Sequence, residues 1–358
     1  MHPFLLSRLL LRFENPTENL LNEMSAIART PDGSLWVGCD EGLSLERLSP
    51  LDDPYQYGNH RSYFLGDFIK LFNQEDEADI EGLDYSQPYL WFTGSHGKKR
   101  NKIKGKKTSK DIQRISEIKT DANRYLLGRI PLVKGELFQS CSHPTEAGLN
   151  LTAAALQKTE QGNCLIGALC DDPHLGSILS AQIPSKDNGL DIEGLAAHED
   201  RVFLGLRGPV LNGWAIILEL QVEETEPGTL TLKAIGENDQ LYKKHFLDLQ
   251  GLGIREICLD KEDLIILAGP TMALEGAMQV FRWKGALEHE DNTLSSRDSD
   301  DLEVLFDLPF TLGSDHAEGL TLMPCSGQDP ALLIAYDSPS SNRLLRPDKI
   351  LLDVFRLQ

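Results

Sequence analysis

A glutamate recurs at one position of a repeated phrase, and its carboxylate is the group in this sequence best suited to chemistry. The phrase is Asp-Ile-Glu-Gly-Leu at 79–83 and 191–195, and His-Ala-Glu-Gly-Leu at 316–320, with a variant of the same register at 256. The repeated acids are Glu81, Glu193, Glu256 and Glu318. Carboxylates that gather in one place resist desolvation unless something compensates them. Ca²⁺ does so with six to eight oxygen ligands, whereas backbone N–H groups of neighbouring strands are the purely structural alternative.

Further polar residues adjoin these acids or follow the next apolar run. We expect the ligand-binding set to be Asp79, His96, Lys98, Asp191, Arg207, Arg255, Asp315 and Asp337, with Asp40 in an equivalent place in the first repeat. The catalytic candidates are His96, Arg207 and His316. Arginine suits an anionic group because its planar guanidinium presents a fork of donors. The alternative is that each side chain only satisfies local hydrogen bonds at a strand end.

Each acid opens a unit that consists of a strand, a turn and a second strand. The second strands are apolar runs such as 90–92, 202–204 and 264–267, and Asp, Gly or Pro precede them. Units begin at 25, 81, 193, 256 and 318, with Ser25 in place of the acid. The gap from 81 to 193 is twice the gap from 25 to 81, which indicates a degenerate copy at about 137–185. Its candidate strands are 149–155, 164–169 and 177–183, and the first of these could equally be a helix.

Repeated groups of three or four strands predict an all-β fold, a single β-propeller of about six blades that spans 1–358. Outer strands are expected at 125–130, 215–221 and 278–283. Segment 4–13 alternates apolar and polar residues and should complete the last blade beside 350–356, leaving no open sheet edge. A pair of β-sandwiches would explain the strands but not the glutamate register. A parallel α/β fold lacks its amphipathic helices.

The first strand of each propeller blade lines the central channel. The repeated acids should therefore ring this channel or its mouth. The second strands should end on one face of the ring, where their polar residues would emerge together.

Charge and cysteine usage exclude several partners. The chain of 358 residues carries a net charge of −20, a field that repels nucleic acid and anionic lipid. Arg8 and Arg12 interrupt the apolar N-terminus, and no apolar run approaches the ~20 residues of a membrane helix. The cysteines show no C-x-x-C spacing, which favours reduced, mostly buried thiols in the cytoplasm. The expected partner is a small anionic ligand or a protein.

One basic segment interrupts this acidic background. Residues 98–110 contain eight Lys or Arg and no acid, within an insertion expected at 97–120. The segment follows Ser95 and His96 directly, so it should hang over the face that carries the polar strand ends. It either steers an anionic ligand or forms a solvated, partly disordered loop.

Several phrases together resemble a bacterial family of unknown function. They are the Asp-Ile-Glu-Gly-Leu repeats, Arg-Val-Phe-Leu-Gly-Leu-Arg-Gly-Pro-Val at 201–210 and Gly-Ser-His-Gly-Lys-Lys-Arg at 94–100. The resemblance covers nearly the whole chain and brings no activity with it. The Glu-Gly-Leu strands are more distantly similar to phytase-like β-propellers, which bind Ca²⁺ through acids at the ring and cleave phosphate esters. That similarity implies Ca²⁺ at the four repeated glutamates and phosphate contacts at His96, Lys98 and Arg207, and Ser25 departs from it.

Two functions follow from these features. One is a ligand- or protein-binding scaffold with an acidic central channel. The other is a Ca²⁺-dependent phosphoesterase or esterase-like hydrolase acting on a small anionic ester.

Overall fold

The computed structural model describes residues 4–17, 19–235, 239–324 and 330–357. The fold is mostly β, with 50% strand and 9% helix, as the alternating and apolar runs predict. Among the described cysteines Cys39 and Cys258 are buried, the other three are half-buried, and all five are free. Cys325 lies outside the described residues.

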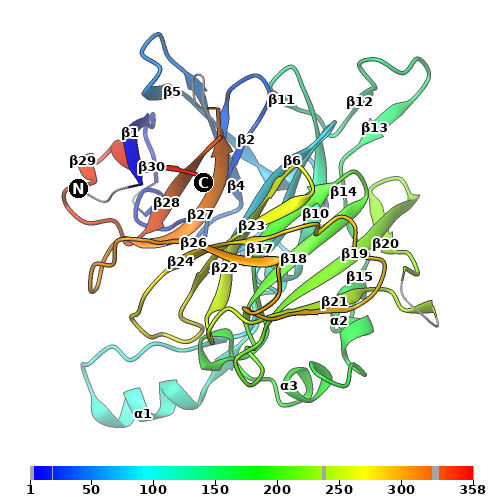
Figure 1. Cartoon of the computed structure of the whole chain (residues 1–358), viewed down its shortest axis with the longest axis vertical. Coiled ribbons are helices and arrows are strands. Elements are labelled where there is room, and N and C mark those ends of the chain that lie inside the picture. Colours follow the sequence, from blue (N-terminus) through cyan, green and yellow to red (C-terminus); the bar gives the residue numbers. More distant parts are fainter. Residues whose placement is uncertain (1–3, 18, 236–238, 325–329, 358) are drawn as a thin grey trace.

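Five inner strands form the centre of the described structure (Figure 1). They are β2 (Met24–Arg29), β6 (Ile80–Ser86), β17 (Asp191–His198), β22 (Gly253–Asp260) and β27 (His316–Met323). Each packs against the next, and β27 packs against β2, so the strands make a closed cycle. Gly82 permits this crowding, because a Cβ atom there would lie 2.6 Å from the Cβ of Leu195 on the neighbouring strand.

Each inner strand leads outward into a sheet of antiparallel neighbours, which gives the fold its propeller-like arrangement. From β2 the first sheet continues through β3 (Leu35–Cys39), β4 (Ser44–Pro50) and β5 (Gln56–Phe64). From β6 the second continues through β7 (Tyr89–Gly94), β10 (Leu127–Val133) and β14 (Ala154–Leu156). From β17 the third continues through β18 (Arg201–Gly208), β19 (Ala215–Glu226) and β21 (Lys243–Leu247). From β22 the fourth sheet continues through β23 (Asp263–Gly269), β24 (Gln279–Trp283) and β26 (Leu302–Asp307). From β27 the fifth continues through β28 (Ala331–Asp337), β30 (Lys349–Arg356) and β1 (Leu5–Arg12).

The core lies between neighbouring sheets. One apolar cluster joins Phe203 and Ile217 of the third sheet to Ile257, Phe281 and Trp283 of the fourth. All five side chains are at most 1% exposed, because each sheet is covered on both faces. This burial explains why the second strands are continuous apolar runs rather than alternating ones.

The remaining elements are short. They are β8 (Lys99–Arg100), β9 (Ile118–Lys119), β11 (Glu136–Leu137), β12 (Ser140–Ser142), β13 (Asn150–Thr152), β15 (Lys158–Thr159), β16 (Gly162–Asn163), β20 (Thr229–Leu232), β25 (Thr293–Ser295), β29 (Leu344–Arg346), α1 (Thr108–Ser116), α2 (Cys164–Leu169), α3 (Gly176–Ser180) and the 3₁₀ turns η1 (Leu65–Asp67), η2 (Ala122–Tyr125) and η3 (Ser185–Asp187).

The described residues contain five inner strands where the spacing predicts six. The segment expected to start the sixth blade forms β13 and β14, which pair with the outer strands β12, β10 and β20 instead of joining the central cycle. The candidate strand 164–169 is helix α2, whose first turn is capped because Asn163 Oδ1 accepts a hydrogen bond from the N–H of Ile166 at 3.1 Å. The extra length between the second and third repeats is therefore an excursion at the rim.

The N-terminal strand joins the last sheet to the first. As its alternation predicts, β1 pairs antiparallel with β30, and the two lie together in Figure 1. Its residues Leu10 and Leu11 also pair in parallel with Gln56 and Tyr57 of β5. Leu9 and Leu11 point into the core, and Arg8 on the other face contacts Asp353.

The basic insertion is more ordered than a solvated loop. It pairs β8 with β9 and carries α1, which projects from the body of the molecule (Figure 1). Among the described residues no helix has the length and apolar character that crossing a bilayer requires.

Leu11→Ala tests the role of β1. Because Leu11 is fully buried, we predict that its truncation lowers the free energy of unfolding by about 2–5 kcal/mol. The matched control is Leu6→Ala on the same strand, whose exposed side chain should change it by about 0.5 kcal/mol or less. Urea unfolding measures both, and equal effects of the two variants would contradict the pairing.

Candidate functional site

A β-bulge interrupts each inner strand at the same level of the ring. The extra residues are Ser25, Glu81, Glu193, Arg255 and, with Gly319, Glu318. A bulge re-aims the side chain it carries. The fourth position is thus Arg255 and not Glu256, which corrects the register expected from the sequence. The backbone pairing aligns Ile254 with Ile80 and Ile192, so Arg255 takes the place of the repeated glutamate and Glu256 that of the glycine after it.

Glu256 is a buried acceptor that bridges two inner strands. Its Oε1 accepts hydrogen bonds from the backbone N–H groups of Leu195 at 2.9 Å and Ile257 at 3.0 Å. Burial raises the pKa of Glu256 well above its ordinary value. Asp84 does the same between β6 and β17, accepting from the N–H of Ala197 at 2.8 Å. For Glu256 the structural alternative therefore holds.

Glu193 is held between two arginines. Its Oε1 lies 2.7 Å from Arg207 Nη1 and its Oε2 lies 2.9 Å from Arg255 Nε. Arg255 also contacts Glu318 on the next strand. Asp191 lies 3.6 Å from Arg207, yet burial and the charge of Glu193 raise the pKa of Asp191 to about 7. The two arginines place positive charge beside both carboxylate oxygens of Glu193.

Asp40, Glu81 and Glu318 form a cluster of a different kind. Each offers one carboxylate oxygen, and these oxygens all lie within 4.8 Å of one another. Glu81 is 8% exposed and has no hydrogen bond or ion pair within the part of the chain that the structure describes. Oδ1 of Asp40 is buried without a hydrogen-bond partner.

Burial and neighbouring carboxylates raise the pKa values of two of these acids. The pKa of Glu81 is raised well above its ordinary value by burial and then by the charge of Asp40. The pKa of Asp40 is raised well above its ordinary value by burial and then by the charge of Asp79. The donors are all hard oxygens, which suits Ca²⁺ or Mg²⁺ and not a metal that prefers thiolate or imidazole.

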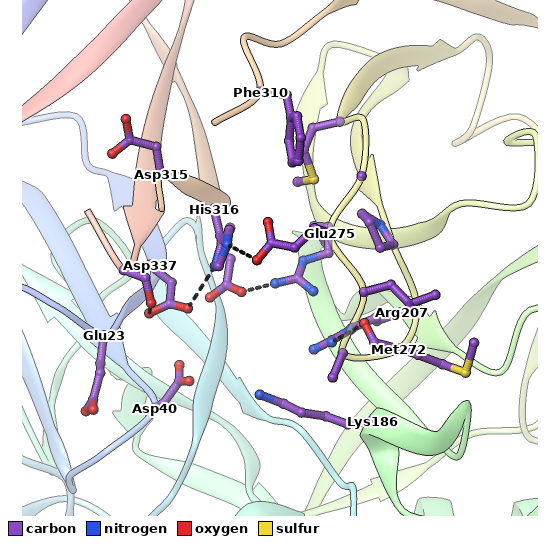
Figure 2. Close-up of a pocket in the computed structure, with 18 of the residues that line it drawn as sticks. Glu23, Asp40, Lys186, Arg207, Met272, Glu275, Phe310, Asp315, His316 and Asp337 are labelled. Atoms are coloured by element: carbon purple, nitrogen blue, oxygen red, sulfur yellow. Dashed lines mark hydrogen bonds and ion pairs between the residues drawn. The ribbon is translucent and has the colours of Figure 1, made fainter. Parts of the chain in front are cut away.

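The cluster opens into two adjoining cavities of about 450 and 420 Å³, which we call the mouth cavity. Both are lined by Asp40, Glu41, Lys102, Lys186, Arg207, Glu318 and Asp337. Figure 2 shows Glu23, Asp40 and Asp337 on one side, Met272 and Phe310 on the other, and His316 between them.

His316 stands between two carboxylates of the mouth cavity. Its Nε2 lies 3.3 Å from Oε1 of Glu275, and its Nδ1 lies 3.7 Å from Oδ2 of Asp337. The hydrogen bond with Asp337 is the main reason that the pKa of His316 is raised. The imidazole therefore keeps its proton to higher pH than a free histidine and is suited to donating it.

Several predicted ligand-binding residues are paired with arginines or lie outside the mouth cavity. Asp79 pairs with Arg124 at 2.7 Å on the wall of the mouth cavity, and Asp315 pairs with Arg343 at 2.9 Å. His96 and Lys98 instead line a separate cavity of about 20 Å³.

His96 is a structural residue in this arrangement. Its Nδ1 lies 2.8 Å from the carbonyl oxygen of Gly94 and its Nε2 lies 2.8 Å from Nδ2 of Asn163. Burial lowers the pKa of His96 to about 4. The structure thus places His96 outside the lining of the mouth cavity.

Sequence reasoning missed Arg124, Lys186 and Glu275, and did not join Asp40 to the acids. Asp40 follows the strand 35–39 directly, just as Asp337 ends the strand 331–337, so its place in the repeat was a usable signal. Arg124, Lys186 and Glu275 lie in segments outside the repeated phrase. No pattern in the sequence places them at the ring.

A family model described as "Protein of unknown function (DUF3616)" matches residues 23–353. The chain belongs to this family. No curated protein matches the sequence.

Three of the solved structures that are similar to this chain carry the names of enzymes. Virginiamycin B lyase from Staphylococcus aureus has 12% identity and a TM-score of 0.37, covering 98% of this chain and 99% of that one. The PQQ-bound aldose sugar dehydrogenase from Streptomyces coelicolor has 11% identity and a TM-score of 0.37, covering 98% of each chain. A putative gluconolactonase has 11% identity and a TM-score of 0.40, covering 96% of this chain and 76% of that one. At these scores the likenesses carry no conclusion about function.

Substitutions of Glu256 test its bridging role. We predict that Glu256→Gln keeps the unfolding free energy at pH 7 or raises it, because the amide oxygen still accepts both N–H groups and the cost of burying a charge is gone. Glu256→Leu should lower it by about 2 kcal/mol or more, since two buried donors lose their acceptor. Urea unfolding at pH 7 compares the two.

The pH dependence gives a second readout from the same variants. The folded pKa of Glu256 lies above its ordinary 4.5, so the folded state holds a proton that the unfolded state releases. This contribution to stability is complete below pH 4.5 and is lost as the pH rises through the folded pKa. The stability of the parent should therefore fall more steeply with rising pH than that of Glu256→Gln, and parallel curves would contradict the buried-acid interpretation.

Proposed function

We propose that the mouth cavity of a single five-bladed propeller ring binds a divalent cation, Ca²⁺ by the chemistry of its donors, and hydrolyses a small anionic ester beside it. Asp40, Glu81 and Glu318 would hold the ion. The observation that carries the proposal is that Glu81, a buried carboxylate, is without a partner among the described residues and lies beside two further carboxylate oxygens.

The donor set suits the ion in number and in charge. Three carboxylates offer up to six oxygens, which reaches the lower end of the Ca²⁺ coordination range. A buried acid without a counter-charge costs several kcal/mol to ionise. A cation would remove that cost for Asp40 and Glu81, the two acids of this cluster whose pKa values are raised.

Residues around the cluster supply the other parts of a hydrolytic site. Lys102 and Lys186 are exposed, line both halves of the mouth cavity and form no ion pair within the described structure, so they can attract an anionic ligand. When bound, a divalent cation polarises an ester oxygen and lowers the pKa of a water molecule. Arg255, fixed by Glu193, keeps Glu318 in place.

In the proposed hydrolysis of the ester, His316 is the group that transfers protons. The oxygen of a water molecule forms a bond to phosphorus or to the carbonyl carbon, and the ester bond to the leaving oxygen breaks. His316 gives its proton to the leaving oxygen and regains one from the water. The products are the acid and the alcohol, and the histidine returns to its starting state.

A non-catalytic ring that binds a protein or a small ligand is the second candidate. Glu256 and Asp84 favour it, because these acids bind backbone N–H groups and act only to hold inner strands together. Glu193 and Asp79 are likewise neutralised by arginines. Turnover of an ester by the purified protein with Ca²⁺ separates the two functions.

Thermal unfolding tests the cation site. We predict that Ca²⁺ raises the melting temperature of the parent, since a ligand at 100 times its Kd stabilises the folded state by about 2.7 kcal/mol. Glu81→Gln should abolish the increase because it removes the unpaired charge while keeping the size of the side chain. The matched control Glu256→Gln should keep it. Equal melting temperatures of the parent with Ca²⁺ and with chelator would rule the site out.

Proton release gives an independent measure of Ca²⁺ binding. Because burial raises the pKa values of Asp40 and Glu81, we expect Ca²⁺ and protons to compete for these acids. We predict that the affinity for Ca²⁺ rises with pH and that binding releases protons. Titration calorimetry in buffers of different ionisation enthalpy counts the protons over a pH series, and an affinity that does not change with pH, with a proton count of zero throughout, would contradict the assignment of these acids.

A further inference from the structure

The mouth cavity has an apolar wall opposite its acids. The wall comes from the segment between β23 and β24 and the segment between β26 and β27, and its residues are Pro270, Met272, Leu274, Met278, Pro309 and Phe310. Met272, Leu274 and Phe310 are among the exposed large apolar residues of the molecule. Leaving them open to water is unfavourable, because each exposes apolar area that a ligand could cover.

The wall is tied to the ionic side by the same residues that organise the acids. Arg207, which binds Glu193, also donates to the carbonyl oxygens of Thr271 at 2.8 Å and Met272 at 3.3 Å. Glu275, which contacts His316, accepts a hydrogen bond from the N–H of Gly313 at 3.2 Å. The two segments are thereby linked to each other and to the floor of the cavity.

The cavity thus has an ionic side and an apolar side. Figure 2 shows Met272 and Phe310 on the side away from Asp40 and Glu23, with His316 between the two sides. A volume of about 450 Å³ lies within the range of small-molecule sites. A bare phosphate or carboxylate ion would occupy only the ionic part and would leave the apolar wall uncovered.

We infer that the ligand is an amphipathic organic anion: a phosphate ester whose charged end meets the cation site and whose aryl or alkyl group lies on Met272, Leu274 and Phe310. This inference rests on the proposed function, because the cation fixes where the charged end sits. The ester bond then falls between the two sides, next to His316. The apolar wall selects the leaving group, while Lys102 and Lys186 select the charge.

Two phosphonates that cannot be hydrolysed test the inference by binding alone. Phenylphosphonate and methylphosphonate carry the same charged group and differ in apolar area. In the presence of Ca²⁺, titration calorimetry should show phenylphosphonate binding at least about tenfold more tightly, since a buried ring contributes at roughly 25 cal/mol per Å².

A double variant tests whether the apolar wall causes the preference for phenylphosphonate over methylphosphonate. Leu274→Ser with Phe310→Ser should reduce the preference for phenylphosphonate to about twofold or less, and should leave the affinities for methylphosphonate and Ca²⁺ unchanged. Both side chains are exposed, so the substitution should not disturb folding. Leu345→Ser, at an exposed leucine on β29 away from the cavity lining, is the matched control and should keep the preference.

The outcomes separate this inference from the proposed function. Equal affinities of the two phosphonates in a parent that binds Ca²⁺ would overturn the inference and leave the cation site standing. An unchanged preference in the double variant would also overturn it. A parent that does not bind Ca²⁺ but prefers phenylphosphonate, with the preference lost in the double variant, would support the apolar wall and overturn the cation site.

Discussion

Carboxylates converge where the five inner strands meet, and the cost of burying negative charge governs how each is placed. Backbone N–H groups satisfy Glu256 and Asp84, and arginines satisfy Glu193 and Asp79. Asp40 and Glu81 receive neither, and burial together with neighbouring negative charge raises their pKa values. The surroundings of each carboxylate therefore differ from one inner strand to the next, although the chemical group is the same.

A bulge in each inner strand, of one residue in the first four and of two in β27, decides which side chain enters the centre. At the fourth strand the bulge selects Arg255 in place of the glutamate that follows it. That exchange puts a guanidinium among the acids, where it joins Glu193 to Glu318. Without this positive charge Glu193 would keep its ion pair with Arg207, whereas Glu318 would lose its contact with Arg255.

Much of the fold could be predicted from the sequence. Apolar runs mark the second strands, and alternation marks the N-terminal strand, because sheets buried on two faces and sheets buried on one impose different patterns. The number of inner strands was wrong, since length alone does not tell a blade from an excursion at the rim. For the site, the repeated phrase identified Glu81 and Glu318 but not Arg124, whose place depends on pairing between strands that are distant in the sequence.

The pairing of β1 with β30 has a consequence for how the chain acquires its structure during synthesis. β1 is translated long before its antiparallel partner at 349–356, so its edge stays unpaired on that side until the residues between the two strands have emerged from the ribosome. Contacts of such sequence separation carry a high entropic cost of loop closure and form late. The exposed leucines of the waiting strand are then a hazard for association with other chains. The arginines that interrupt them, Arg8 and Arg12, place charge on that open edge and disfavour such pairing.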